Sequence, residues 1–286
     1  MTDNSASPGT TSDPATAQKP AKTPDNKPEK KEDNFFVFLT KLVLIVVIFR
    51  SFIFSPFNIP SESMLPTLAN GDYLLAAKWP YGFTSDSLPF GAPLIPGRIW
   101  AGEPERGDIA IFKHPVDGTD YIKRVIGIPG DTVEMRGGQV ILNGEAIPKE
   151  QMADFEIAPS PNTQCHVMSR TVIKEDGETV CSYTRFKETL PSGESYEVLD
   201  FGPQFQDNFG PIIVPEGEMF VMGDNRDNSQ DSRFSAEPGG GVGMVPQDLL
   251  LARASVIMWS TDGSSEWLLP WTWFTALRGE RLGNGL

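Results

Sequence analysis

Apolar residues dominate one stretch near the start of the chain, residues 35–54, in which only Lys41 and Arg50 carry charge. A membrane-spanning helix needs roughly 20 mostly apolar residues, and this stretch has that length. The pattern predicts a retained transmembrane anchor over 35–54, because the two basic side chains can extend towards lipid headgroups near the ends of a span. A helix buried in the protein's own core and a cleaved signal peptide are the alternatives. The signal peptide is disfavoured because no Ala-x-Ala site follows the apolar stretch.

The residues around this stretch predict its orientation. Residues 1–34 are polar and contain no aromatic residue, so they bury too little apolar surface to offset chain entropy and should form a disordered tail. Lysines precede the stretch, whereas after Arg50 the next basic residue is Lys78. The positive-inside rule therefore predicts a single pass, with a cytoplasmic N-terminus and everything from about residue 56 outside.

Beyond the anchor, short apolar runs alternate with turn residues, which is typical of β-structure. Gly137-Gly138 and Asn143-Gly144 are strong signals for tight turns. No long run outside the anchor has helical periodicity, so the pattern predicts a mostly β fold. The expected strands are 109–112, 121–126, 132–135, 139–142, 219–222 and 254–258.

Composition narrows the possible functions of this 286-residue chain. The formal net charge is −14, and no basic stripe would offset phosphate repulsion, so nucleic acid is not an expected partner. The two histidines and two cysteines match no zinc pattern, and we expect no metal site. Cys165 and Cys181 flank a predicted turn at Asp176-Gly177. Outside the cytoplasm they could form a disulfide across a hairpin, and two buried free thiols are the alternative.

Three segments are candidates for chemistry. In the stretch Ile59-Pro-Ser-Glu-Ser-Met-Leu-Pro-Thr67, Ser61 and Ser63 would point to one side of an extended chain, although Ser-x-Ser is common in loops. Lys123 lies in an apolar strand, where burial would lower its pKa and allow the neutral amine to take a proton from a serine; a solvated lysine is the ordinary alternative. The third segment, Met222-Gly-Asp-Asn-Arg-Asp-Asn-Ser-Gln-Asp-Ser-Arg233, is too polar for a core and lacks the pattern of an EF-hand loop.

Together these segments resemble type I signal peptidase, a membrane-bound Ser/Lys endopeptidase that removes signal peptides from exported preproteins. Five stretches match the family in order over roughly residues 50–260, and the run from Gly223 to Ser229 is nearly diagnostic. The family commonly has Gly in the middle of its Ser-x-Ser, where this chain has Glu62, which we expect to point away from the chemistry. The matching stretches are 56–68, 71–78, 106–112, 120–124 with 127–131, and 223–233.

The resemblance implies the catalytic roles. Ser63 would be the nucleophile and Lys123 the general base, and the Ser61 hydroxyl with the Ser63 backbone N–H would form the oxyanion hole. Ser229 would help to orient the lysine amine. A Ser–His–Asp triad using His114 is the weaker alternative, because His114 lies in a predicted turn outside every matching stretch.

The resemblance also implies supporting and substrate-binding residues. Asp231 and Arg233 would form a structural ion pair close to the site, with Asp224 and Arg124 in support. The residues that would line the substrate cleft are Phe57, Ile59, Met64, Leu68, Asp120, Tyr121 and Ile122.

The expected architecture is a mostly β protein with an N-terminal transmembrane helix, a β-rich catalytic core and an inserted smaller β domain. The core would comprise residues 55–135 and 215–262, and the insertion would comprise 136–214. The aromatic C-terminal segment, 263–286, should pack on the core; an anchor at the membrane interface is the alternative.

The implied function is removal of signal peptides at the bacterial inner membrane, with the catalytic domain on the periplasmic side. Substrates would be exported preproteins with small residues before the cut. Membrane lipid would be the second partner, and we expect a monomer that needs no cofactor. Two alternatives remain, a tethered β domain that binds exported chains without cutting them and a related Ser/Lys protease with a narrower substrate set.

Overall fold

A computed structural model describes residues 1–3, 9, 35–266 and 268–286. The predicted disordered tail therefore lies almost wholly outside the described residues. The chain divides into two compact units, Met1–Lys41 and Leu42–Leu286.

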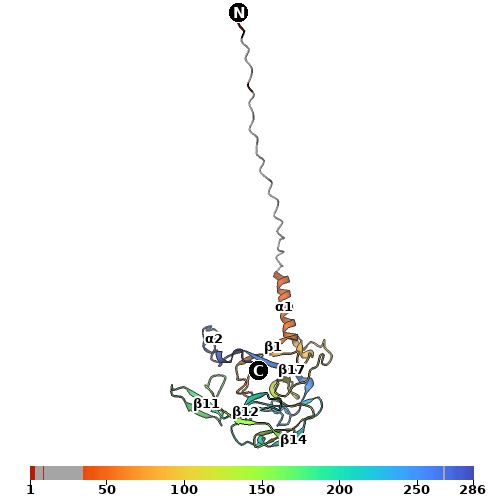
Figure 1. Ribbon diagram of the computed structural model, residues 1–286, viewed down its shortest axis with the longest axis vertical. Coiled ribbons are helices and arrows are strands. Elements are labelled where there is room, and N and C mark those ends of the chain that lie inside the picture. Colours follow the sequence, from red (N-terminus) through yellow and green to blue (C-terminus); the bar gives the residue numbers. More distant parts are fainter. Residues whose placement is uncertain (4–8, 10–34, 267) are drawn as a thin grey trace. The chain divides into compact units, whose positions relative to one another are not determined.

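Helix α1 (Phe35–Phe52) occupies most of the predicted anchor (Figure 1). It is the one helix among the described residues that is long and apolar enough to cross a membrane, and only Ser51 in it is buried. The helix ends two residues before the predicted boundary, because Phe54 already pairs with Ala77 as the first residue of β1. The apolar stretch is thus shared between a helix and the first residue of a strand.

An antiparallel seven-stranded sheet forms the centre of the larger unit, in the order β1-β2-β17-β3-β4-β15-β16. The predicted strands at 109–112, 121–126, 219–222 and 254–258 are confirmed within it. Both faces of β3 are covered from Ile109 to Phe112, which explains its continuous apolar run, whereas β4 is buried only from Lys123 onwards and includes two basic residues. The strands are β1 (Phe54–Asn58), β2 (Asp72–Ala77), β3 (Ile109–Lys113), β4 (Asp120–Gly127), β15 (Glu218–Met222), β16 (Val245–Pro246) and β17 (Leu250–Ser260).

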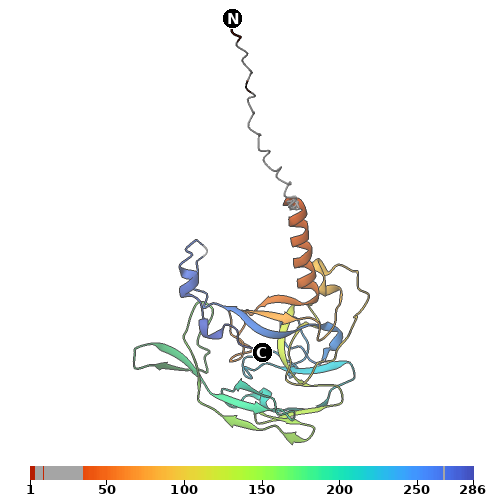
Figure 2. The ribbon, with the colours of Figure 1, turned by 45° about the horizontal axis from the view of Figure 1, so that its top comes forward.

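Residues between β4 and β15 form three smaller sheets (Figure 2). The predicted strands at 132–135 and 139–142 are confirmed as β5 and β6, joined through Gly137-Gly138. Asn143 and Gly144 both have positive φ (55° and 85°), as a tight hairpin turn requires. The sheets are β14-β5-β6-β7, β10-β11-β9 and β13-β12-β8, built from β5 (Thr132–Arg136), β6 (Gln139–Leu142), β7 (Glu145–Ala146), β8 (Lys149–Gln151), β9 (Phe155–Ile157), β10 (Arg170–Ile173), β11 (Thr179–Tyr183), β12 (Arg185–Thr189), β13 (Ser195–Leu199) and β14 (Phe209–Ile213).

Cys165 and Cys181 are joined by a disulfide, but not across the predicted hairpin. Asp176-Gly177 does turn the chain between β10 and β11, and Cys181 lies on β11. Cys165, however, precedes β10, in the loop that follows β9. The bond therefore ties this loop to the sheet rather than linking two paired strands.

The remaining helices among the described residues are short. Two of them, α2 and η5, lie in the C-terminal segment, whose aromatic part is largely exposed. Leu268, Trp271 and Phe274 expose 65–84% of their surface, so the prediction that this aromatic segment packs on the core is wrong for them. The chain ends beside β17, where the Leu286 N–H donates to Ser255 O at 3.0 Å (Figure 1). The short helices are α2 (Thr272–Thr275), η1 (Ser85–Ser87), η2 (Pro89–Gly91), η3 (Phe205–Asp207), η4 (Gln247–Leu249) and η5 (Gly279–Arg281).

Candidate active site

Ser63 lies in a tight turn that follows edge strand β1. The Leu65 N–H donates to Glu62 O at 3.2 Å, so the extended chain predicted around the two serines is wrong. The hydroxyls of Ser61 and Ser63 nevertheless lie 3.4 Å apart. The next side chain, Met64, is fully buried against β2, β3 and β17, and this burial fixes the turn on the sheet.

Strand β4 brings Lys123 to Ser63. The lysine Nζ lies 2.8 Å from the serine Oγ and also donates to Ile122 O at 3.1 Å. The amine is enclosed, since Lys123 is 4% exposed and Ser63 is 8% exposed. Two residues far apart in sequence thus form a buried hydroxyl–amine pair.

The environment of Lys123 weakens its hold on a proton. Burial lowers the pKa of Lys123 from 10.5 to about 8, because the charged form loses its hydration. Asp231 and Asp224 oppose this shift by attracting the ammonium, and Arg233 adds to it by repulsion. With such a pKa, about a tenth of the amine is neutral at pH 7, whereas a free lysine would be almost wholly charged.

The polar loop after β15 is bonded to the serine turn. The Asn225 N–H donates to Ser63 O at 3.1 Å, and the Asn225 side-chain amide donates to Glu62 O at 3.1 Å. Gly223 approaches so closely that a Cβ there would collide with Ser229 Oγ and come within 2.5 Å of Ser63 O. Glycine is therefore required at position 223 for the loop to reach the turn.

Two buried ion pairs join the polar loop to its surroundings: Asp231–Arg233, which was expected as a pair, and Arg124–Asp224, whose residues were expected only in supporting roles. Arg124 binds Asp224 through two bonds, of 2.8 and 2.7 Å, and so joins the loop to the strand that carries the lysine. Asp231 accepts from Arg233 at 2.9 Å and from the Gly223 N–H at 3.0 Å, which fixes both ends of the loop.

A third buried ion pair was missed by sequence reasoning. Glu188 on β12 accepts two bonds from Arg226, of 2.8 and 2.6 Å, and a third from the Tyr196 hydroxyl at 2.9 Å. Arg226 belongs to the diagnostic run, which could have suggested a buried partner. Glu188 lies in an ordinary polar strand, Arg185–Thr189, and carries no signal of its own.

Two hydrogen-bond donors near Ser63 are free to bind an oxyanion. The Ser61 side chain is exposed, so its hydroxyl can turn towards a bound substrate. The Ser63 backbone N–H donates to no acceptor among the residues that the structure describes. Both groups can therefore donate to a developing negative charge without first breaking a strong bond.

Ser229 does not make its expected bond. Its Oγ is buried beside Gly223 and has no hydrogen-bond partner among the described residues, and Lys123 donates to Ser63 and Ile122 instead. The serine is close to the site but does not orient the amine in this conformation.

The residues expected to line the cleft fall into two groups. Ile59, Met64 and Leu68 are at most 3% exposed and belong to the core, so the prediction that they line an open cleft is not met in this conformation. Phe57 on β1 is half-buried, and the other three, Asp120, Tyr121 and Ile122, begin β4.

The start of β4 has one free edge. Strand β3 pairs with β4 from Asp120 onwards, but β15 pairs with it only from Arg124 to Gly127. Within the described part of the chain, the backbone of 120–122 thus has no strand on its second edge. An extended peptide can add there by backbone hydrogen bonds, beside Lys123.

His114 and Glu62 both face away from the Ser63–Lys123 pair. His114 is 1% exposed; its Nε2 lies 3.1 Å from Gly241 O, and its Nδ1 accepts the Val116 N–H at 3.1 Å. Both ring nitrogens are thus engaged with backbone groups, which argues against a histidine base. The Glu62 carboxylate accepts the backbone N–H of Gln164, and its burial raises its pKa.

Comparison with known proteins identifies close relatives. A family model described as signal peptidase, peptidase S26, matches residues 33–259. Signal peptidase I of Rickettsia typhi is 36% identical over 249 residues, covering 84% of this chain and 83% of that protein. Signal peptidase I of Rickettsia massiliae is 36% identical over 250 residues with the same coverage. A solved signal peptidase I from Enterococcus faecalis is 26% identical and covers 53% of this chain and 96% of its own, but its TM-score of 0.28 is too low to bear on the fold.

Proposed function

The chain belongs to the signal peptidase I family, peptidase S26, and on that premise we propose that Ser63 and Lys123 are the catalytic pair with which it removes signal peptides. The family makes it a serine endopeptidase. The observation that carries the assignment of residues is the 2.8 Å contact between the buried Lys123 amine and the Ser63 hydroxyl.

In the first half-reaction, neutral Lys123 takes the proton of Ser63 as Oγ attacks the scissile carbonyl carbon. The carbonyl oxygen becomes an oxyanion, which the Ser61 hydroxyl and the Ser63 N–H stabilise. The Lys123 ammonium then gives its proton to the leaving nitrogen. The C–N bond breaks, and the signal peptide remains as an ester on Ser63 while the mature chain departs with a free amine.

In the second half-reaction, water replaces the amine. Lys123, neutral again, takes a proton from a water molecule as that water attacks the ester carbon. The same two donors stabilise the second oxyanion. When the ester bond breaks, the proton returns to Ser63 Oγ and the signal peptide leaves with a free carboxylate. The buried ion pairs keep the serine turn and the lysine strand in register throughout.

The substrate would bind as an extended strand along the free edge at 120–122, opposite Phe57 on β1. Small residues before the cut would follow from the shallow space between these strands. Helix α1 would anchor the enzyme in the bacterial inner membrane as a single-pass monomer with a cytoplasmic N-terminus. The short distance along the chain supports membrane anchoring of the site: Ser63 follows the end of α1 by only eleven residues, so the site would lie near the membrane surface.

Cleavage of a preprotein by the full chain in detergent tests the catalytic pair. Ser63→Ala and Lys123→Ala should each reduce kcat to background, and Ser61→Ala should reduce it by about 10²–10³, the usual effect of removing one oxyanion donor. Lys187→Ala, at an exposed lysine on β12, is the matched control and should be fully active. Wild-type activity in either Ser63→Ala or Lys123→Ala would refute the proposed pair.

A further inference from the structure

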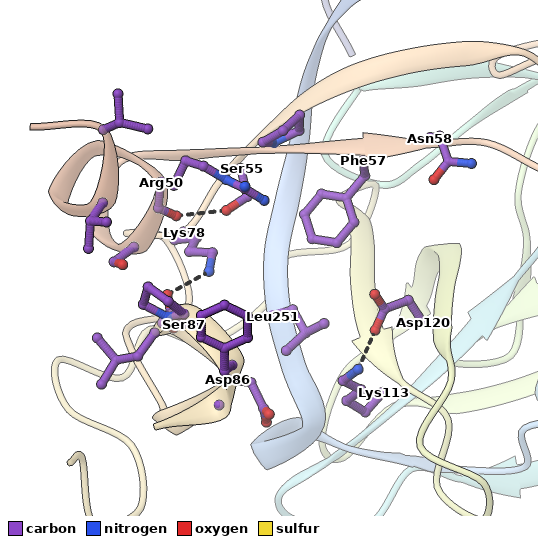
Figure 3. A pocket seen from close by; sticks show the side chains of 18 residues that line it. Arg50, Ser55, Phe57, Asn58, Lys78, Asp86, Ser87, Lys113, Asp120 and Leu251 are labelled. Atoms are coloured by element: carbon purple, nitrogen blue, oxygen red, sulfur yellow. Dashed lines mark hydrogen bonds and ion pairs between the residues drawn. The ribbon is translucent and has the colours of Figure 1, made fainter. Parts of the chain in front are cut away.

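A cavity of about 720 Å³ lies where helix α1 meets the sheet (Figure 3). Its walls come from the last turns of α1, from β1 and from the loop that contains η1 and η2. Three cations line it, Arg50, Lys78 and Lys113. Their convergence at the end of an apolar helix has no part in the proposed mechanism.

Lys78 is the most unusual of the three, because it is 6% exposed and yet its ammonium group makes a single hydrogen bond among the described residues, to Ser87 O at 3.1 Å. Among the described residues no carboxylate lies within ion-pairing distance of it. Burial and, to a lesser degree, repulsion by Arg50 lower its pKa from 10.5 to about 8, and attraction by Asp86 and Asp120 opposes this shift. A buried cation is expensive unless a charge of opposite sign approaches it.

The Arg50 guanidinium also lacks an ion-pair partner among the described residues. The backbone carbonyl of Arg50 accepts the Ser55 hydroxyl (Figure 3). Of the two acids in the cavity, Asp120 is already paired with Lys113 at 2.7 Å, and Asp86 is exposed at the rim. Both acids attract the Lys78 ammonium across the cavity, but among the described residues no carboxylate lies within ion-pairing distance of Lys78 or of Arg50. Compensation of the helix dipole would explain Arg50 alone, but not a buried lysine on a neighbouring loop.

The surroundings favour a lipid over a soluble anion. Val46 and Val47 of α1 form one wall, and Phe90 on the adjoining loop is fully exposed. That loop contains no acidic residue from 87 to 102. Basic side chains at the end of a membrane helix with apolar residues around them suit a headgroup and the start of its acyl chains. With a net charge of −14, the protein offers no general attraction that would draw anionic lipid to it.

From this cavity we infer a site for the phosphate group of an anionic phospholipid, held by Arg50 and Lys78 at the outer end of α1. The inference rests on the proposed membrane anchoring and not on the catalytic pair. A bound phosphodiester would place one negative charge between the two cations and accept bonds from both.

Titration of the full-length protein in a non-ionic detergent with dihexanoylphosphatidylglycerol, below its micelle concentration, tests the site by calorimetry. Arg50→Gln and Lys78→Gln should each weaken binding about fivefold, the usual worth of one basic residue at a lipid headgroup. Lys187→Gln removes an exposed lysine outside the cavity and should bind as the wild type does. Ser63→Ala should also bind normally, which separates this site from the proposed catalysis.

Two further ligands identify the source of the phosphate. Dihexanoylphosphatidylcholine should bind more weakly than phosphatidylglycerol, and inorganic phosphate more weakly still. Equal binding by inorganic phosphate would overturn the lipid assignment, as would unchanged binding in Arg50→Gln. If Lys78→Gln does not fold, Arg50→Gln decides the outcome, because its exposed side chain has no partner to lose among the described residues.

Discussion

If Lys123 is the base as proposed, its pKa of about 8 would set the pH at which the Ser63–Lys123 pair reacts. Only the neutral amine can take the Ser63 proton, so kcat/KM should rise as pH increases and level off above about 8. The same depressed pKa means that the folded state binds fewer protons than the unfolded chain between about 8 and 10.5. Folding stability due to this lysine therefore increases with pH across that window.

Measurement of kcat/KM from pH 6 to pH 11 tests this prediction. The midpoint should lie near 8, and a midpoint close to the ~10.4 of free lysine would show that burial does not activate Lys123. Lys78 also has a pKa of about 8 and could mimic the effect. Lys78→Gln is therefore the control, and it should leave the midpoint where it is.

Replacement of Gly223 tests whether displacing Ser63 lowers activity when the side chains of Ser63 and Lys123 are unchanged. An added Cβ would collide with Ser229 Oγ and press on Ser63 O, so Gly223→Ala should displace the nucleophile. We expect a loss of at least tenfold in kcat and about 1–3 kcal/mol in stability, as overpacking usually costs. Gly279→Ala, where a Cβ meets open space, is the matched control in assays of cleavage and thermal unfolding. Normal kcat in Gly223→Ala would mean that the loop tolerates displacement.

Strand β12 is linked to the candidate active site through a buried ion pair. Its Glu188 holds Arg226 of the polar loop after β15 in a fully buried pair, so breaking that pair should loosen the loop. Glu188→Ala leaves an unpaired buried cation and should destabilise the fold by about 3–5 kcal/mol. Glu197→Ala breaks a half-exposed pair with Arg185 on the same sheet and should cost about 1 kcal/mol or less. Similar losses in the two variants, measured by chemical denaturation, would contradict a special role for Glu188.

The strands that sequence reasoning located correctly are those with an unambiguous local pattern. Apolar runs punctuated by Gly, Pro or Asp-Gly predicted β3, β4, β5, β6, β15 and part of β17, and Gly-Gly and Asn-Gly marked the turns after β5 and β6, because tight turns and burial act over a few residues. The extended Ser61–Ser63 stretch was wrong, since the bonds that curl it come from the turn itself and from a loop more than 150 residues away. Pairings such as Glu188 with Arg226 depend on which strands become neighbours, and no local pattern encodes that.

At the level of the whole molecule, the catalytic assignment and the lipid site depend on the same orientation. Ser63 follows helix α1, and the Arg50–Lys78 cavity lies at the C-terminal end of that helix in the larger unit, so both should lie on the outer side of the membrane. The exposed aromatic residues of the C-terminal segment would then face the same compartment. If the helix were inverted, the acidic larger unit would lie in the cytoplasm. The cleavage sites of exported preproteins, which emerge on the outer side of the membrane, would then be out of its reach.

Labelling of single introduced cysteines with a membrane-impermeant maleimide in spheroplasts distinguishes these orientations. The native cysteines form a disulfide and should remain silent, which the unmodified chain controls. Ser264→Cys, at an exposed position after β17, should label in intact spheroplasts, whereas Thr16→Cys in the N-terminal tail should label only after permeabilisation. The positive-inside rule predicts this asymmetry, because lysines precede the helix and no basic residue follows Arg50 until Lys78. Labelling of Thr16→Cys in intact spheroplasts would reverse the topology and would remove the basis for both the outer active site and the outer-leaflet lipid site.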